Sequence, residues 1–153
     1  MDKVICIQTH DFNQQTEYER LKKQSSIGAV VTFTGLVRDV NQHQSVVELS
    51  LEHYPGMTEK SLEKIIQQAK ERWNIIASTV IHRVGTFSVS DQIVFVGVAC
   101  PHRGDAFSAC EFIMDYLKTD APFWKKETLK NGETKWVDAR ESDQQALSKW
   151  DIS

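Results

Sequence analysis

The sequence predicts an α+β fold: a single domain with a mixed or antiparallel sheet, two main helices and a C-terminal β-hairpin. Three observations support this prediction. Several short β-branched or apolar runs indicate strands, two longer segments repeat apolar residues at helical spacing, and Asn131–Gly132 separates two further strand-like segments. Strands combined with helices and a hairpin in this way are typical of the α+β class. No linker or repeat divides the chain, so we expect residues 1–153 to form one domain.

The first third of the chain is predicted to be mostly strand. Weak alternation indicates a first strand, and β-branched residues between glycines indicate a second. A third strand stops at Pro55–Gly56, a pair that favours a turn. We expect these three strands at Val4–Thr9, Gly28–Val37 and Val46–Tyr54. Thr16–Lys23 is expected to form a short helix, and Asp39–Ser45 a polar loop before the third strand.

Two amphipathic helices are predicted further along the chain. The first has Thr58 as its expected N-cap, and its apolar residues recur at i, i+3, i+4, i+7 and i+11. These residues are Leu62, Ile65, Ile66, Ala69 and Trp73. The second helix is expected at Ala106–Thr119, ended by Pro122. Between the helices we expect strands at Ile75–Val84 and Gln92–Ala99, the second so continuously apolar that it should be central.

The Asn131–Gly132 pair predicts a hairpin with a two-residue type I′ turn, because both residues tolerate positive φ. In the simplest register, Lys125 lies opposite Asp138 and Lys126 lies opposite Val137. The hairpin strands are expected at Trp124–Lys130 and Glu133–Ala139, followed by a last helix at Glu141–Trp150.

Composition excludes several classes of protein. With 41% hydrophobic residues and a net charge of -3, the chain is neither disordered nor a general nucleic-acid binder, which would need a basic surplus. Three cysteines at wide spacings suit neither a disulfide framework nor a metal knuckle. The N-terminus shows no signal-peptide pattern, and no apolar run is long enough to span a membrane. We therefore expect a cytoplasmic protein with no membrane or nucleic-acid partner.

Four short segments carry more polar chemistry than folding requires. They are Val37–Asp39, Cys100–Arg103, Lys118 and Lys125–Lys126. His102–Arg103 lies where a helix is about to begin, so backbone N–H groups and two cationic side chains could hold a phosphate. The alternative is an ordinary solvated loop. Cys100 beside His102 also suggests a thiol nucleophile, since an imidazolium and a helix N-terminus both favour thiolate.

Both lysine segments have alternative interpretations. Lys118 lies in the last turn of its helix, where any cation is stabilised by the helix dipole. Lys125 and Lys126 are adjacent on a strand, so their side chains point to opposite faces. A cross-strand pair with Asp138 would explain Lys125 without catalysis, whereas a partly buried lysine near other cations could act as an acid or base. The residues alone leave these alternatives open.

Motifs for metal, nucleotide or classical hydrolase sites are absent from the sequence. The histidines outside the Cys100–Arg103 segment show no metal-binding spacing; they are His10, His43, His53 and His82. No phosphate-binding glycine-rich loop and no G-x-S-x-G motif occurs. We expect neither a metal nor a cofactor.

Several longer sequence segments resemble those of one family, the large, catalytic subunit of molybdopterin synthase. These segments occur in the same order as in the family and cover the chain from about residue 28 to 150. They are Val30–Arg38, Leu51–Lys60, Val80–Gly85, Ile93–Val98, His102–Arg103, Phe112–Thr119, Ala121–Glu127 and Trp136–Glu141. The resemblance implies an α/β-hammerhead-like fold.

The resemblance also implies a reaction and its partners. Members of this family insert two sulfurs into cyclic pyranopterin monophosphate, giving the dithiolene of molybdopterin. The sulfur arrives as a thiocarboxylate on the C-terminal glycine of a small ubiquitin-like subunit. Two large subunits form the central dimer of a heterotetramer, with one small subunit at each end. A rival hypothesis is a non-catalytic anion-binding or assembly module of the same fold.

The matching sequence segments imply which residues form the site. Lys118 and Lys125 match the two lysines on which family members rely for catalysis, and both are expected to contact substrate. The other positions implied as substrate-binding are Leu36, Val37, Arg38, His102, Arg103, Lys126 and Glu127, with Arg140 as a weaker candidate. Arg offers the planar fork that suits phosphate oxygens, and lysines can supply a proton or stabilise developing negative charge.

Overall fold

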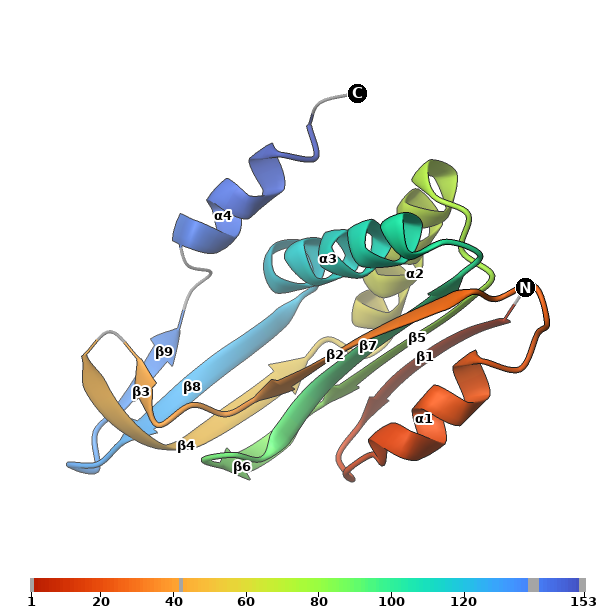
Figure 1. Cartoon of the computed structure of the whole chain (residues 1–153). Helices are drawn as coiled ribbons and strands as arrows, with labels where there is room; N and C mark the ends of the chain where they lie inside the picture. The colour runs from red at the N-terminus through yellow and green to blue at the C-terminus, as the bar shows by residue number, and fades with distance from the viewer. Residues whose placement is uncertain (1, 42, 138–140, 152–153) are drawn as a thin grey trace.

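The computed structural model describes residues 2–41, 43–137 and 141–151, and it contains two sheets and four helices (Figure 1). The strands of the first sheet are β1 (Asp2–Gln8), β2 (Ala29–Leu36), β5 (Ala77–Arg83) and β7 (Gln92–Cys100). Those of the second are β3 (Val40–Asn41), β4 (Gln44–His53), β6 (Gly85–Ser88), β8 (Phe123–Leu129) and β9 (Thr134–Val137). The helices are α1 (Gln14–Leu21), α2 (Met57–Arg72), α3 (Arg103–Asp120) and α4 (Glu141–Ser148). The predicted α+β class is confirmed.

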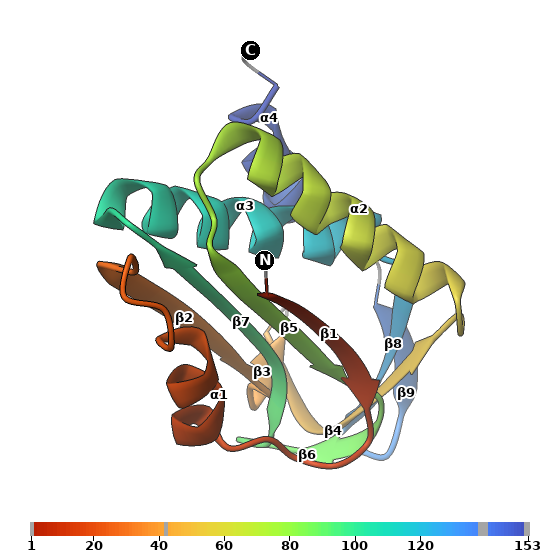
Figure 2. The same cartoon turned by 90° about the vertical axis from the view of Figure 1, so that its right-hand side faces the viewer.

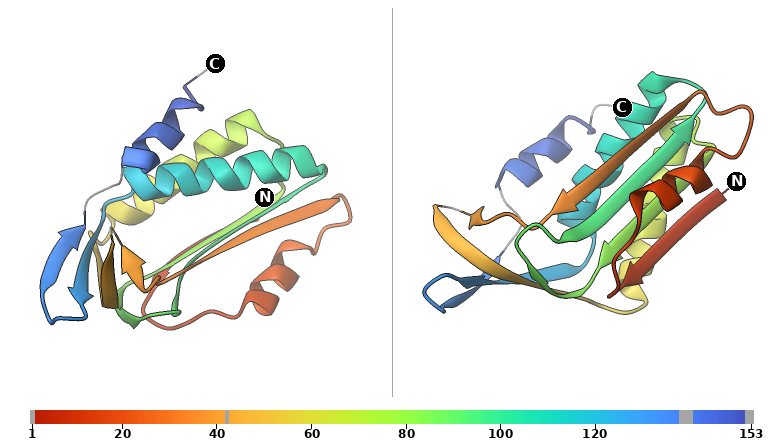
Figure 3. Two further views of the ribbon diagram at one scale, coloured as in Figure 1. Left: turned by 60° about the vertical axis from the view of Figure 1, so that its left-hand side comes forward. Right: turned by 60° about the horizontal axis from the view of Figure 1, so that its bottom comes forward.

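The first sheet has the order β1-β5-β7-β2, with β1 parallel to β5 and the other neighbours antiparallel. β7 is therefore internal, as its apolar sequence predicts. Its side chains alternate between two clusters: Val94, Val96 and Val98 pack under α2 and α3, while Phe95 and Ala99 pack toward α1. Figures 2 and 3 show these helices on opposite faces of the sheet. Burial on both faces explains the unbroken apolar run of β7.

Helix α2 confirms the predicted apolar stripe, but its N-cap lies two residues before the expected one. Leu62, Ile65, Ile66 and Ala69 are all buried. The N-cap is Gly56, with φ 85°, and its N–H donates to the Glu59 carboxylate at 2.8 Å. The prediction of Thr58 as the N-cap was wrong, because its hydroxyl lies inside the helix and donates to the Tyr54 carbonyl instead. None of the helices in the described ranges is long and apolar enough to cross a membrane.

The second sheet contains the main departures from prediction. The expected loop Asp39–Ser45 holds β3 and the first residues of β4, which pair as a short hairpin. The four-residue strand β6 was not predicted. It follows β5 through Gly85, whose φ of 124° turns the chain from the first sheet into the second, where β6 pairs with β4.

The predicted register of the C-terminal hairpin was wrong by one residue. Lys125 pairs with Val137 and Lys126 with Trp136. The Leu129 N–H donates to the Glu133 carbonyl at 2.7 Å, so the loop has three residues rather than two. Within it Gly132 has φ 90°, which is the pattern of a turn closed by a left-handed glycine. The position directly opposite Lys125 is therefore taken by Val137, and Asp138 and Ala139 lie outside the described residues.

Helix α3 joins the two sheets, and its start is fixed by a close approach of two backbone segments. Its N-cap is His102, and its first residue, Arg103, lies three residues before the predicted start at Ala106. The Gly28 N–H donates to the Cys100 carbonyl at 3.0 Å, and a Cβ on Gly28 would overlap the Pro101 carbonyl oxygen. Gly28 therefore has to lack a side chain for β2 to pass the loop before α3.

We expect Gly28→Ala to destabilise the protein by about 1–3 kcal/mol, because the added methyl group meets backbone that cannot move aside. Urea unfolding followed by circular dichroism measures the loss. The matched control is Gly104→Ala in the first turn of α3, where nothing lies within 4 Å of the added Cβ. The control should be neutral or slightly stabilising. Equal stabilities of the two variants would contradict the overlap.

Candidate active site

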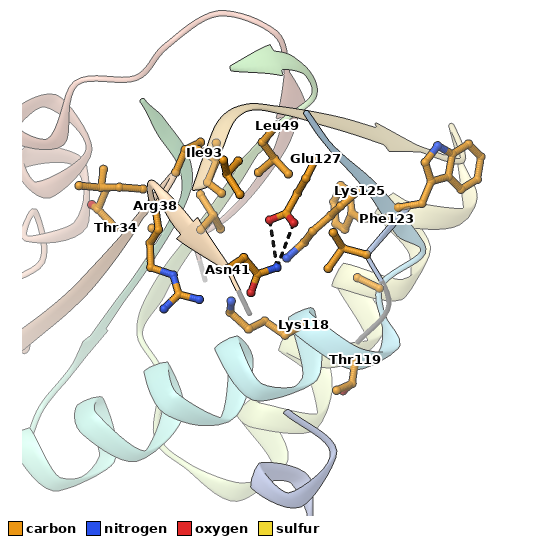
Figure 4. A pocket seen from close by; sticks show the side chains of 18 of the residues that line it. Thr34, Arg38, Asn41, Leu49, Ile93, Lys118, Thr119, Phe123, Lys125 and Glu127 are labelled. Atoms are coloured by element: carbon orange, nitrogen blue, oxygen red, sulfur yellow. Dashed lines mark hydrogen bonds between the residues drawn. The ribbon is translucent and has the colours of Figure 1, made fainter. Parts of the chain in front are cut away.

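A cavity of about 810 Å³ lies between the two sheets, under the C-terminal end of α3 (Figure 4). Its wall is formed by the end of β2 and the segment after it, by β3 and β4, by the end of α3 and by β8. The volume suits a small molecule of the size of a nucleotide or a pterin. The cavity thus draws its lining from segments that are far apart in the sequence.

Three cationic side chains from three segments line this cavity. Arg38 follows β2, Lys118 lies in the last turn of α3, and Lys125 lies on β8. In Figure 4 their side chains point toward the same space. Lys118 and Arg38 are exposed, whereas Lys125 is half-buried. Several cations around one cavity favour an anionic ligand.

The alternation of β8 decides which of its residues face the cavity. Phe123, Lys125 and Glu127 lie two apart and line it together. Lys126 points the other way, with its Nζ 5.8 Å from the centre of the Trp136 ring. The structure therefore brings Lys125 and Glu127 together with Lys118 but leaves the Lys126 side chain outside.

Leu36 and Val37 position the segment that carries Arg38. The Val37 N–H donates to the Asp91 carbonyl at 3.0 Å, and the Val37 carbonyl accepts from the Ser90 N–H at 2.8 Å. The Val37 side chain is buried with those of β4 and β6, whereas Leu36 is exposed at the rim of the cavity. Both backbone bonds fix the direction in which the chain leaves β2.

Glu127 is a buried carboxylate in this cavity, which Asp120 also lines. The Asn41 Nδ2 of β3 donates to both carboxylate oxygens, at 3.1 and 3.0 Å. A buried carboxylate is costly unless its oxygens are hydrogen-bonded, so this amide stabilises it. Asn41 was missed in the sequence because it falls in a segment that looks like a polar loop.

His82 lies directly behind the cavity wall. Its ring stacks on Phe123 with a centroid distance of 3.8 Å and an angle of 18°, and its Nδ1–H donates to the Arg83 carbonyl at 2.9 Å. The pKa of His82 is lowered to about 4, chiefly by burial and in part by the positive charges of Lys125, Lys118 and His53, while the hydrogen bond to the Arg83 carbonyl acts in the opposite direction. The ring is therefore neutral at pH 7. Its place after a run of β-branched residues, Thr79–Ile81, was the available signal for a buried imidazole.

His102 and Arg103 lie at the far end of α3 from Lys118. Fifteen residues of helix separate Arg103 from Lys118, which corresponds to roughly 22 Å at 1.5 Å per residue. Both residues are exposed, beside the first turn of the helix. Within a single chain, His102 and Arg103 therefore do not reach the cavity that Lys118 and Lys125 line. Arg140 lies outside the described residues.

The geometry does not support Cys100 as a nucleophile. Its side chain is fully buried in the core under α2 and α3, and burial raises the pKa of the thiol to about 11. The nearby Asp105 carboxylate contributes to this increase in the pKa. The three cysteines are free thiols. In the described ranges, no group of three His, Cys, Asp or Glu side chains is placed to hold a metal ion.

Comparisons with known proteins agree with one another. The sequence model of the family described as "MoaE protein" matches residues 7–120. The molybdopterin synthase catalytic subunit of Vibrio cholerae is 56% identical over 151 residues, which cover 99% of this chain and 100% of the relative.

Solved structures give the same result. The chain resembles molybdopterin cofactor biosynthesis protein E of Burkholderia multivorans, with a TM-score of 0.83, 50% identity and coverage of 100% and 99% of the two chains. It also resembles molybdopterin synthase of Staphylococcus aureus, with a TM-score of 0.79, 33% identity and coverage of 86% and 95%.

We expect the stability of the protein to fall as the pH falls from about 6.5 to about 4, partly because of His82. The native state holds this ring neutral while the unfolded chain protonates it, so the unfolded state binds more protons in this window. A pKa shift of this size corresponds to about 3 kcal/mol. Urea unfolding at a series of pH values measures the slope.

The control for this measurement is a pair of variants. His82→Gln should flatten the slope relative to the wild type, whereas His10→Gln, at an exposed position, should leave it unchanged. Parallel slopes for the wild type and His82→Gln would show that the buried imidazole does not contribute.

Proposed function

The chain belongs to the MoaE protein family, and on that premise we propose that it is the catalytic subunit of a molybdopterin synthase. The enzyme is a sulfurtransferase of molybdenum cofactor biosynthesis. Its substrate is cyclic pyranopterin monophosphate, which receives two dithiolene sulfurs. The donor is the thiocarboxylated C-terminus of a small ubiquitin-like subunit. Residues 1–153 act as one catalytic-subunit domain, and free cysteines support a cytoplasmic location.

The observation that carries this proposal is the meeting of Lys118, Lys125 and Arg38 around one cavity. A cyclic phosphate needs fixed cations, and Arg38 provides the planar fork that matches phosphate oxygens. Lys118 lies in the last turn of α3 and is exposed, so an extended C-terminal tail can reach it. A metal-free acid–base reaction needs only these side chains and the incoming sulfur.

The two lysines have separate parts in the proposed mechanism. The thiocarboxylate sulfur attacks a carbon of the pterin side chain, and the oxygen that leaves must receive a proton. Water then hydrolyses the acyl C–S bond of the resulting thioester, so the sulfur stays on the pterin and the small subunit leaves with a C-terminal carboxylate. Lys125, half-buried beside Glu127, is the proton donor, while the exposed Lys118 holds the anionic thiocarboxylate terminus. Opening of the cyclic phosphate develops further negative charge, which both ammonium groups stabilise.

His102 and Arg103 join this site from a second copy of the chain. β2 is an edge strand, because among the described strands only β7 pairs with it. Its first residue lies beside Cys100, while its last residue reaches the cavity rim. If two copies pair through β2 in antiparallel fashion, each copy's His102–Arg103 approaches the other's Leu36–Arg38. The second copy thereby supplies the cations that one chain holds about 22 Å away.

A non-catalytic anion-binding or assembly module is the second candidate function. It would need the cations of the cavity but not a half-buried lysine beside a buried carboxylate. The pairing of Lys125 with Glu127 on one face of β8 favours the enzyme.

We expect Lys118→Ala and Lys125→Ala each to lower turnover about a hundredfold or more, because each removes a group that acts on the reacting atoms. The measurement is dithiolene product formed from the cyclic precursor by the complex with thiocarboxylated small subunit. Cys100→Ala is the control and should keep most of the activity. An active wild-type complex with near-normal Lys125→Ala turnover would contradict the role of Lys125, and no product from the wild type would support the binding module.

We expect Lys118→Ala and Arg103→Ala to complement each other when the two inactive proteins are mixed and allowed to exchange subunits. Half of the dimers are then mixed and have one intact site of two, so about a quarter of wild-type activity returns. Each variant alone is the reference. Activity that does not return on mixing would place both residues in the same chain's site.

A substitution on the edge strand β2 tests the proposed dimer in a second way. Phe33 on β2 is 39% exposed, and Phe33→Asp should weaken the dimer at least about tenfold in sedimentation velocity. Tyr18 on α1 is 38% exposed and is the matched control, so Tyr18→Asp should leave the mass unchanged. A stable Phe33→Asp dimer would move the interface away from β2.

A further inference from the structure

We propose that Asn41 is a positioning residue of the active site, which holds the Glu127 carboxylate charged and directed toward Lys125. This inference rests on the proposed function and extends it to a residue outside the lysines and the substrate-binding stretches. The contact is the bidentate one from the Asn41 amide nitrogen to both Glu127 oxygens, shown by dashed lines in Figure 4.

The burial of both partners makes this contact more than a surface hydrogen bond. Asn41 is 6% exposed and Glu127 is 7% exposed. A carboxylate taken out of water loses much of its hydration, and donors held at about 3 Å compensate for this loss. The amide is neutral, so it solvates the carboxylate without cancelling its charge. Asn41 therefore allows a negative charge to remain at the wall of the cavity.

The position of Asn41 in the chain supports a dedicated role. Its neighbour Val40 is exposed, and so is His43, which has φ 66°. β3 contains only two residues, and its ladder to β4 is equally short. Asn41 is thus a buried side chain in a short, mostly exposed hairpin. Its contact with Glu127, 86 positions along the chain, attaches this hairpin to β8.

The charge on Glu127 acts on its neighbour along the strand. Lys125 lies two residues before Glu127 on the same face of β8, and both line the cavity with Lys118. A fixed anion in a poorly solvated site stabilises nearby ammonium groups. Figure 4 shows the Glu127 carboxylate and the Lys125 side chain next to each other at the cavity wall. Asn41 therefore fixes a carboxylate next to the lysine that acts as the proton donor before the substrate enters.

An exchange of the two partners separates a positioning role from a merely structural one. Asn41→Asp alone places two carboxylates in contact and should lower the melting temperature by about 5 °C. The double variant Asn41→Asp/Glu127→Gln rebuilds an amide–carboxylate pair with the charge on β3 instead of β8. It should recover most of the lost stability, while kcat in the reconstituted reaction stays at least about tenfold below wild type.

The steady-state constants of the double variant give the second readout. If Glu127 serves Lys125, kcat falls while the KM for the cyclic precursor changes by less than about threefold. Asn74→Asp is the matched control, because it makes the same substitution at an exposed site, and it should match wild type in both melting temperature and kcat.

Three results would overturn the proposal. A double variant with wild-type kcat would show that the contact is structural and that the charge on Glu127 is not used. An unchanged melting temperature for Asn41→Asp would show that the contact does not form in solution. A double variant that fails to recover stability would show that the two side chains are not partners. Failure of the proposed function is distinct, because it would appear as a wild-type complex without product.

Discussion

The packing of α3 across the four-stranded sheet is the constraint on which the site depends. One face of this helix is buried, with seven residues from Ala106 to Leu117 in the core under it. A helix held along this length cannot bend or slide without opening the core. Its C-terminal end therefore places Lys118 at the cavity, and its N-terminal end places His102 and Arg103 away from the cavity, at the opposite end of the same helix. The same packing fixes the distance between the two groups of cations.

The second constraint is the passage of the chain between the two sheets. Gly85 turns β5 into β6, and the backbone bonds of Val37 turn β2 toward β3. These two crossings leave the cavity open between the sheets. The buried groups around it are neutral or compensated: His82 is held uncharged by burial, and Glu127 is hydrogen-bonded by Asn41. The cationic side chains of Arg38, Lys118 and Lys125 line the same cavity, so its charge favours an anionic ligand.

Much of the fold was predictable, because it depends on patterns that are local in sequence. The apolar stripe of α2 and the continuous apolar run of β7 correctly indicated a half-buried helix and an internal strand. The errors arose where tertiary contacts decide the outcome. Thr58 looks like a cap but lies within the helix, and the Asn131–Gly132 turn takes a third residue that shifts the register. β3 exists only through its pairing with β4, so no local signal marks it.

The site was predictable in its residue types but not in its arrangement. Lys118 and Lys125 were identified from sequence segments that match the family, and the structure places both at one cavity. Alternation along β8 could already place Lys126 on the face opposite Lys125, and it does lie there. Asn41 and His82 were missed because their partners, Glu127 and Phe123, are more than forty positions away in sequence, and no periodicity reports such contacts.

The length of α3 also explains why a net charge of -3 is compatible with an anionic substrate. The net charge sums the whole chain, whereas a ligand meets the local charge, and Arg38, Lys118 and Lys125 line one cavity. Helix α3 keeps Arg103 about 22 Å from Lys118, and Glu127 lies on the same face of β8 as Lys125, so one chain limits the repulsion between its own cations. In the proposed dimer the second copy's Arg103 would join these cations, so that binding of the substrate's phosphate and association of the subunits would favour each other.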